Sequence, residues 1–87
     1  MNEFEQCQSR LLRLVDGLAA RRHLFELTEA LIDRYRIRDD TAEQTAMRSW
    51  LESELSGVSA ALVDTRHSES LNRKAIVMQT ALDAFKK

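Results

Sequence analysis

The sequence predicts an all-α protein, because its composition and its apolar pattern both favour long helices. The 87 residues include no Pro and only two Gly, the residue types on which the tight turns of sheet proteins depend. Apolar residues recur at helical spacing over most of the chain. We therefore expect one domain over residues 1–87, in which a long N-terminal helix packs antiparallel against one or two following helices, as a helical hairpin or a three-helix bundle.

The first expected helix covers about residues 3–37 and carries a regular apolar seam. Five apolar side chains follow one another at a strict spacing of seven: Phe4, Leu11, Leu18, Phe25 and Ile32. A repeat of seven places side chains along one side of a helix, as in coiled coils. Arg21 and Thr28 interrupt the complementary positions, and further Leu residues widen the stripe, which is more typical of a bundle than of a two-stranded coil.

The segment "RIRDDTAEQ" predicts a corner between two helices. Basic residues suit the C-terminal end of one helix, and acidic residues suit the start of the next, because of the helix dipole. Asp40 can cap the second helix, and Glu43 stands three residues further on, which is the spacing of a capping box. We expect the second helix to cover about residues 41–63 and to turn back along the first.

The remaining apolar residues form two stripes, which lie about half a turn out of phase. The first stripe contains Met47, Leu51, Leu55, Val58 and Leu62, and the second contains Leu71, Ala75, Met78, Leu82 and Phe85. Either the chain breaks at residues 64–69 and a third helix covers about 69–86, with Ser68 as its cap, or one long helix changes its buried face. We favour the break.

The charge balance and the hydropathy of the chain limit the kinds of partner. The formal net charge is −1, whereas binding to nucleic-acid phosphates needs a clustered positive surface. Residues 39–69 contain two Arg and seven acidic residues, a net charge of −5. No stretch approaches the roughly 18 apolar residues of a membrane span, and the first ten residues do not resemble a signal peptide. We expect a cytoplasmic protein with no nucleic-acid partner.

The side chains that are able to carry chemistry are isolated from one another. His23 and His67 lie far apart, and neither has a second ligand at helical spacing, so we expect no metal site. Cys7 is the single Cys and lies on the seam of the first helix, which predicts a buried, inert thiol in a reducing compartment. A glycine-rich phosphate loop is absent from the sequence. We therefore predict no catalytic residue, no cofactor and no enzyme activity.

The segments "LLRLVDGLAARRHLFEL" and "IRDDTAEQ" resemble the first helix and the turn of the all-helical chorismate mutases. The resemblance implies a catalytic role for Arg21, and active-site positions for Asp39, Glu43 and Gln79. The chorismate mutases have basic residues at three positions where this chain has Phe4, Ile32 and Ala42. Such an enzyme stabilises an anionic transition state with several cations. An enzyme of this type, or a degenerate relative of it, is therefore the alternative function.

The segment "SLNRKAIVMQTALDAF" resembles the C-terminal helix of the flagellar hook-protein chaperones, which serve export systems of the flagellar and type III secretion type. The residues that carry this likeness are Asn72, Ala75, Ile76, Val77 and Leu82. The resemblance implies a small cytosolic chaperone that covers the aggregation-prone helix of an exported subunit.

Together with the apolar stripes, the resemblance to these chaperones predicts a non-catalytic protein-binding module. Such a module is a chaperone or adaptor that covers an apolar helix of a partner or forms a homodimer. A bundle of two or three helices hides few large side chains, and burying each one contributes about 1.5–3 kcal/mol. Trp is also a frequent interface anchor. The predicted partner-binding residues are Phe4, Leu11, Trp50, Met78, Leu82 and Phe85.

Overall fold

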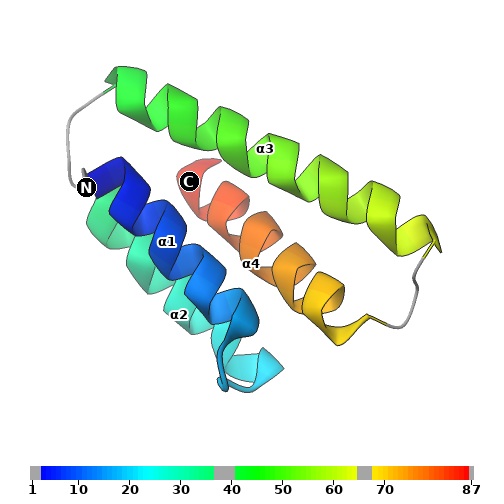
Figure 1. Ribbon diagram of the computed structural model, residues 1–87. Helices are drawn as coiled ribbons and strands as arrows, with labels where there is room; N and C mark the ends of the chain where they lie inside the picture. Colours follow the sequence, from blue (N-terminus) through cyan, green and yellow to red (C-terminus); the bar gives the residue numbers. More distant parts are fainter. Residues whose placement is uncertain (1–2, 37–40, 65–67, 87) are drawn as a thin grey trace.

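In the computed structural model, the chain forms four helices that pack into a bundle (Figure 1). The structure describes residues 3–36, 41–64 and 68–86. The helices are α1 (Glu3–Asp16), α2 (Arg21–Arg36), α3 (Thr41–Asp64) and α4 (Glu69–Lys86). The described residues contain no strand. The predicted all-α class is therefore confirmed, and the packed helices form a bundle of four rather than two or three.

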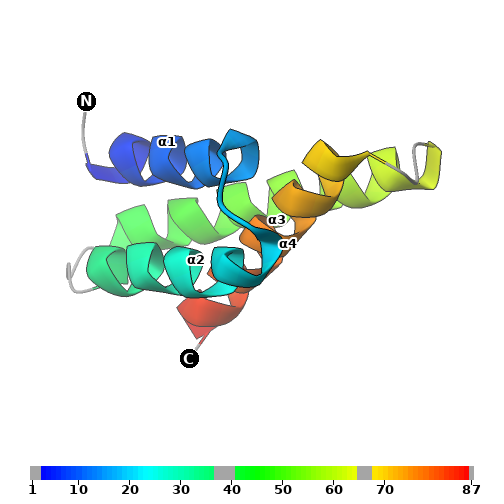
Figure 2. The same cartoon turned by 90° about the horizontal axis from the view of Figure 1, so that it is seen from below.

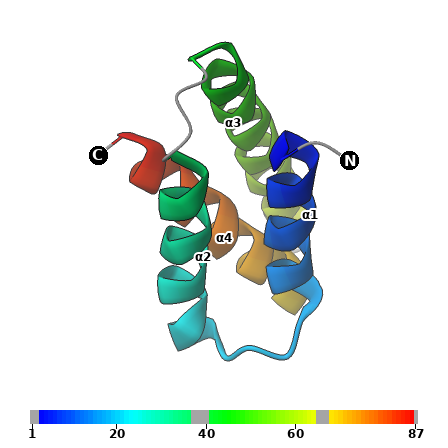
Figure 3. The same ribbon diagram turned by 90° about the vertical axis from the view of Figure 1, so that its left-hand side faces the viewer.

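The single N-terminal helix predicted over residues 3–37 is wrong, because the chain leaves the helix after Asp16 and begins α2 at Arg21. Gly17 stands at the bend. A Cβ atom at this position would lie 2.9 Å from the carbonyl oxygen of Arg13, a distance that real Cβ atoms essentially never show. Because Gly17 has no side chain, its backbone can lie this close to the carbonyl of Arg13 at the end of α1. After the turn, α2 lies beside α1 and runs in the opposite direction (Figure 3).

The break also changes which side chains face the core. Two of the five residues of the predicted seam lie outside the core, since Leu18 is fully exposed and Phe25 is half exposed. The buried positions of α1 are Cys7, Leu11 and Val15, and those of α2 are Leu24, Thr28, Ile32 and Tyr35. Each helix thus has its own stripe, at spacings of four in α1 and of four and three in α2, which are typical of one face of an α-helix.

The last two helices begin and end close to the predicted positions. Glu43 lies in the first turn of α3, whereas Asp39 and Asp40 lie outside the described residues. Because α3 and α4 are two separate helices, the interpretation of one long helix with a change of face is wrong. The hydroxyl oxygen of Ser68 accepts a hydrogen bond from the backbone N–H of Leu71 at 3.2 Å, as expected for the residue that caps α4.

The centre of the bundle is α4, which packs against each of the other three helices (Figures 1 and 2). Its buried side chains lie on several sides of the helix: Val77, Met78, Thr80, Ala81, Leu82, Ala84 and Phe85. The rings of Tyr35 and Phe85 meet edge to face, with centroids 5.9 Å apart. In contrast, α3 packs chiefly against α4 and extends beyond α1 and α2 (Figure 1). The core is therefore assembled around α4.

Candidate functional site

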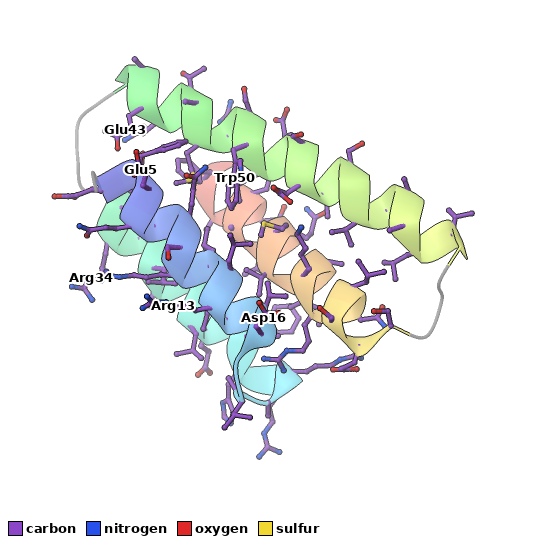
Figure 4. The ribbon with its side chains drawn as sticks, in the orientation of Figure 1. Glu5, Arg13, Asp16, Arg34, Glu43 and Trp50 are labelled. Carbon is purple, nitrogen blue, oxygen red and sulfur yellow. The ribbon has the colours of Figure 1, made fainter. Side chains whose placement is uncertain are left out.

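The six predicted partner-binding residues belong to the core of the protein itself. Four of them, Leu11, Met78, Leu82 and Phe85, are buried. Phe4 and Trp50 are partly buried and pack against the same core, and Trp50 points from α3 toward the other helices (Figure 4). The break at Gly17 explains this difference from the prediction, because the extra helix that it creates covers α4. In this conformation the four buried residues offer no surface to a partner.

One side chain that sequence reasoning did not single out joins the end of α1 to α4. The guanidinium of Arg73 donates hydrogen bonds to four backbone carbonyl oxygens, those of Leu14, Val15, Gly17 and Ala19, at 2.8, 2.8, 3.1 and 2.6 Å. The last carbonyl groups of any helix lack partners within the helix. Arg73 supplies those partners, and its positive charge also suits the negative end of the helix dipole.

Two other cations of the bundle are held in ion pairs between helices. Arg21 makes two hydrogen bonds to the carboxylate of Glu69, at 2.9 and 3.1 Å, and links the first residues of α2 and α4. The ammonium of Lys74 lies 2.6 Å from the carboxylate of Glu54, between α4 and α3. These contacts link neighbouring helices and occupy the cations that make them.

The residues matched to chorismate mutases do not gather at one place. Arg21 is engaged by Glu69 at the start of α2, whereas Glu43 lies at the start of α3, at the other end of the bundle (Figure 4). Gln79 is exposed on α4 and donates a hydrogen bond to Asp83 at 3.0 Å. Asp39 lies outside the described residues. The described part of this set therefore forms no common pocket.

An open groove runs between α1 and α2. We call it the α1–α2 groove. Its apolar half has a volume of about 380 Å³ and is lined by Leu14, Leu27, Ala30 and Leu31 together with Arg10, Arg13 and Arg34. Its polar half, of about 290 Å³, shares Arg10, Leu31 and Arg34 and continues to Glu3, Gln6, Cys7 and Tyr35.

The apolar half of this groove contains Leu27, whose side chain is 41% exposed, and Leu14 and Leu31, which are partly buried. Arg10, Arg13 and Arg34 are all exposed. Figure 4 shows Arg13 and Arg34 projecting from neighbouring helices on the same side of the molecule, away from α3. An apolar strip beside cationic side chains is thus presented to solvent between two rigid helices.

A second groove lies on the other flank of α2, among α2, α3 and α4. Its apolar lining includes Phe25, which is 50% exposed, with Leu55 and Ile76. The charged residues of its described lining are Glu29 and Asp83, and its volume is about 440 Å³. We call it the α2–α4 groove. The two grooves therefore share α2 as a wall and differ in the charged residues of their described lining.

Comparisons with known proteins give no family for this chain. No family model, no curated protein and no solved structure matches it. None of the described helices has both the length and the apolar character that crossing a membrane requires. Within residues 3–36, 41–64 and 68–86, no group of three His, Cys, Asp or Glu side chains is placed to hold a metal ion. His23 is exposed at the start of α2, and His67 lies outside the described residues.

Sequence reasoning missed the α1–α2 groove because the groove exists only where the chain turns back at residues 17–20. With one straight helix over 3–37, residues of the two halves are far apart. Given the turn, Leu27, Leu31 and Arg34 fall at spacings of four and three along α2, opposite Arg10 and Leu14 of α1. A local sign of this turn is Gly17, because glycine often stands just after the last residue of a helix.

The thiol of Cys7 is buried, as predicted, with 6% of the residue exposed. Burial raises the pKa of the Cys7 thiol from its ordinary value of 9.0 to about 11, and the nearby charge of Arg10 opposes this rise only in part. Because the thiolate is the reactive form, the raised pKa agrees with the prediction that this thiol is inert at neutral pH.

Cys7 gives the stability of the protein a defined dependence on pH. In the unfolded chain the thiol ionises near pH 9, and in the folded protein near pH 11, so the folded state holds more protons between these values. The free energy of unfolding therefore falls as pH rises through this window, by about 2–3 kcal/mol in all. Below pH 9 the contribution is fully present. Urea midpoints measured from pH 8 to pH 10.5 should fall more steeply for the wild type than for Cys7→Ala, and parallel curves would contradict the assignment.

Proposed function

We propose that this protein is a non-catalytic adaptor or small chaperone that binds an amphipathic helix of another protein. The observation that carries the proposal is the apolar half of the α1–α2 groove, where Leu14, Leu27 and Leu31 form a strip that the bundle does not cover. An amphipathic helix laid into an apolar groove is a recurring mode of peptide recognition. The proposed partner-binding surface is the outside of α1 and α2, not the core.

The dimensions of the groove suit a short helix. Its walls, α1 and α2, have 14 and 16 residues, which at a rise of about 1.5 Å per residue give about 21–24 Å of length. A partner helix of similar length, with apolar residues at spacings of three and four, matches the strip formed by Leu27 and Leu31. The walls are held in place by Arg73 and by the shared core, so binding does not require the helices to be ordered first.

The likeness of residues 70–85 to the hook-protein chaperones supports an exported subunit as the source of such a helix, and a cytoplasmic site of action. Within that likeness, Val77 and Leu82 are buried in the core, and Ile76 lines the α2–α4 groove. The likeness therefore concerns the framework of the bundle more than the α1–α2 groove. The identity of the partner rests on the resemblance, and the binding mode rests on the groove.

The proposal is tested with a synthetic amphipathic helix whose apolar face is Leu and whose other residues are uncharged. Titration into the isotope-labelled protein is expected to shift the NMR signals of the methyl groups of Leu14, Leu27 and Leu31. Leu27→Ser should weaken binding about tenfold, since one Leu side chain loses its burial against the partner.

Phe25→Ser is the matched control, because Phe25 is another large, partly exposed side chain of α2 but lines the other groove. It should leave the affinity for the peptide unchanged. The proposal fails if no methyl signal of the α1–α2 groove moves at millimolar peptide, or if the two substitutions weaken binding equally. Sedimentation of the protein alone shows whether a second copy occupies the groove instead.

A further inference from the structure

We infer that the helix bound in the α1–α2 groove is acidic, with carboxylate side chains flanking its apolar face. The inference rests on the proposed function and names the chemistry of the partner at the same site. Its basis is the set of three arginines, Arg10, Arg13 and Arg34, that line the apolar half of the groove, where the described lining contains no acidic residue.

The three arginines lie around the apolar strip in a fixed arrangement. Arg10 and Arg13 are three residues apart on α1, so that they point to the same face of that helix. Arg34 comes from α2, on the opposite wall of the groove. Cations on both walls with leucines between them fit a helix that carries a narrow apolar stripe with carboxylates along both of its edges. The planar guanidinium group binds carboxylates with two hydrogen bonds, which favours this pairing.

The three arginines have no ion-pair partner among the residues that the structure describes. Their acidic neighbours in the sequence, Asp16 and Asp33, form no ion pair with them. The cations that build the bundle behave differently: Arg21 pairs with Glu69, Lys74 pairs with Glu54, and Arg73 binds backbone carbonyl groups. The arginines of the groove are thus free to pair with a ligand, whereas the structural cations are already engaged.

The charged side chains of the two grooves differ in sign among the described residues, which argues against a general affinity for any amphipathic helix. The charged residues of the described lining of the α2–α4 groove are Glu29 and Asp83. A helix with basic flanks is repelled by Arg10, Arg13 and Arg34 of the α1–α2 groove. These arginines therefore favour an acidic helix, and electrostatic matching of this kind determines specificity more than total affinity.

A second copy of this chain is a poorer occupant of the same groove. In a twofold symmetric dimer each surface patch meets its own copy or the residues around it. Two α1–α2 grooves placed face to face bring six exposed arginines together, and the described lining of the apolar half contains no carboxylate. Like charges placed opposite one another oppose association. An acidic helix from a different protein avoids this repulsion.

The experiment compares three synthetic helices that share one Leu face and differ only in their flanks, which are Glu, Gln or Lys. At low salt, we expect the Glu helix to bind about tenfold more tightly than the Gln helix, and the Lys helix to bind most weakly. The advantage of Glu should shrink as salt is raised, because exposed charges are screened. The double variant Arg13→Gln/Arg34→Gln should remove most of the advantage, while Arg48→Gln, at an exposed position of α3, should retain it.

The outcomes separate this inference from the proposed function. Equal binding of the Glu and Gln helices, with the same affinity for the double variant, overturns the acidic partner and leaves helix binding intact. Failure of all three helices to bind overturns both. A further measurement tests binding of the protein to vesicles of phosphatidylserine and phosphatidylcholine in the absence of peptide. Tighter binding to the anionic vesicles than to the Glu helix, lost in the double variant, overturns a protein partner in favour of a membrane surface.

Discussion

Replacement of Arg73 by Met is expected to lower the free energy of unfolding by about 2–4 kcal/mol, although Arg73 is only partly buried. The substitution keeps much of the apolar stem and removes all four hydrogen bonds to the carbonyl groups of residues 14, 15, 17 and 19. These groups then lose charged donors at the end of α1. Chemical denaturation measures the loss, and hydrogen exchange should locate it in the last turn of α1 and the following connection.

Two variants control this prediction. Arg73→Lys keeps the charge but not the planar arrangement of donors, so an intermediate loss is expected. Arg48→Met removes an exposed arginine of α3 and should change the free energy of unfolding by less than about 0.5 kcal/mol. Equal stabilities of Arg73→Met and Arg48→Met would show that the contacts of Arg73 do not hold α1.

Leu11→Ala is expected to destabilise the protein by about 3 kcal/mol, because Leu11 is completely buried among the helices. The prediction separates two roles for this side chain. As part of the core, Leu11 contributes the same stability at every protein concentration. As part of an interface between copies, it would contribute a stability that depends on concentration. Thermal melting at concentrations that differ a hundredfold decides between the roles.

The neighbouring residue provides the control, since Leu12 is 39% exposed on the same helix. Leu12→Ala should change the free energy of unfolding by no more than about 0.5 kcal/mol, because it leaves the core intact. Similar losses for the two substitutions would mean that the side of α1 that faces the core is assigned incorrectly.

The features that could be predicted from the sequence are those with local signals. The absence of Pro and the helical spacing of apolar residues led to the all-α class. Ser68 followed by a new stripe located the start of α4, and the position of Cys7 on an apolar face predicted its burial. In each case the residues that decide the outcome lie within one or two helical turns of one another, so the linear sequence contains them together.

The break between α1 and α2 could not be predicted in this way. Its segment "GLAA" contains no Ser, Thr, Asp or Asn to cap a new helix, and at the start of α2 the N–H of His23 donates a hydrogen bond to the carbonyl of Ala20. The carbonyl groups freed by the break are satisfied by Arg73, which is more than 50 residues away. The candidate site could not be predicted for the same reason, because the groove depends on this turn.

The central place of α4 has a consequence for synthesis on the ribosome. The chain is made in the order α1, α2, α3, α4, so the helix that contacts all of the others is the last of the four to emerge. Until it does, the apolar faces of α1, α2 and α3 lack the surface on which they pack, and the end of α1 lacks Arg73. We therefore expect the nascent chain to gain little protection from proteases before α4 has emerged, and then to fold in one cooperative step.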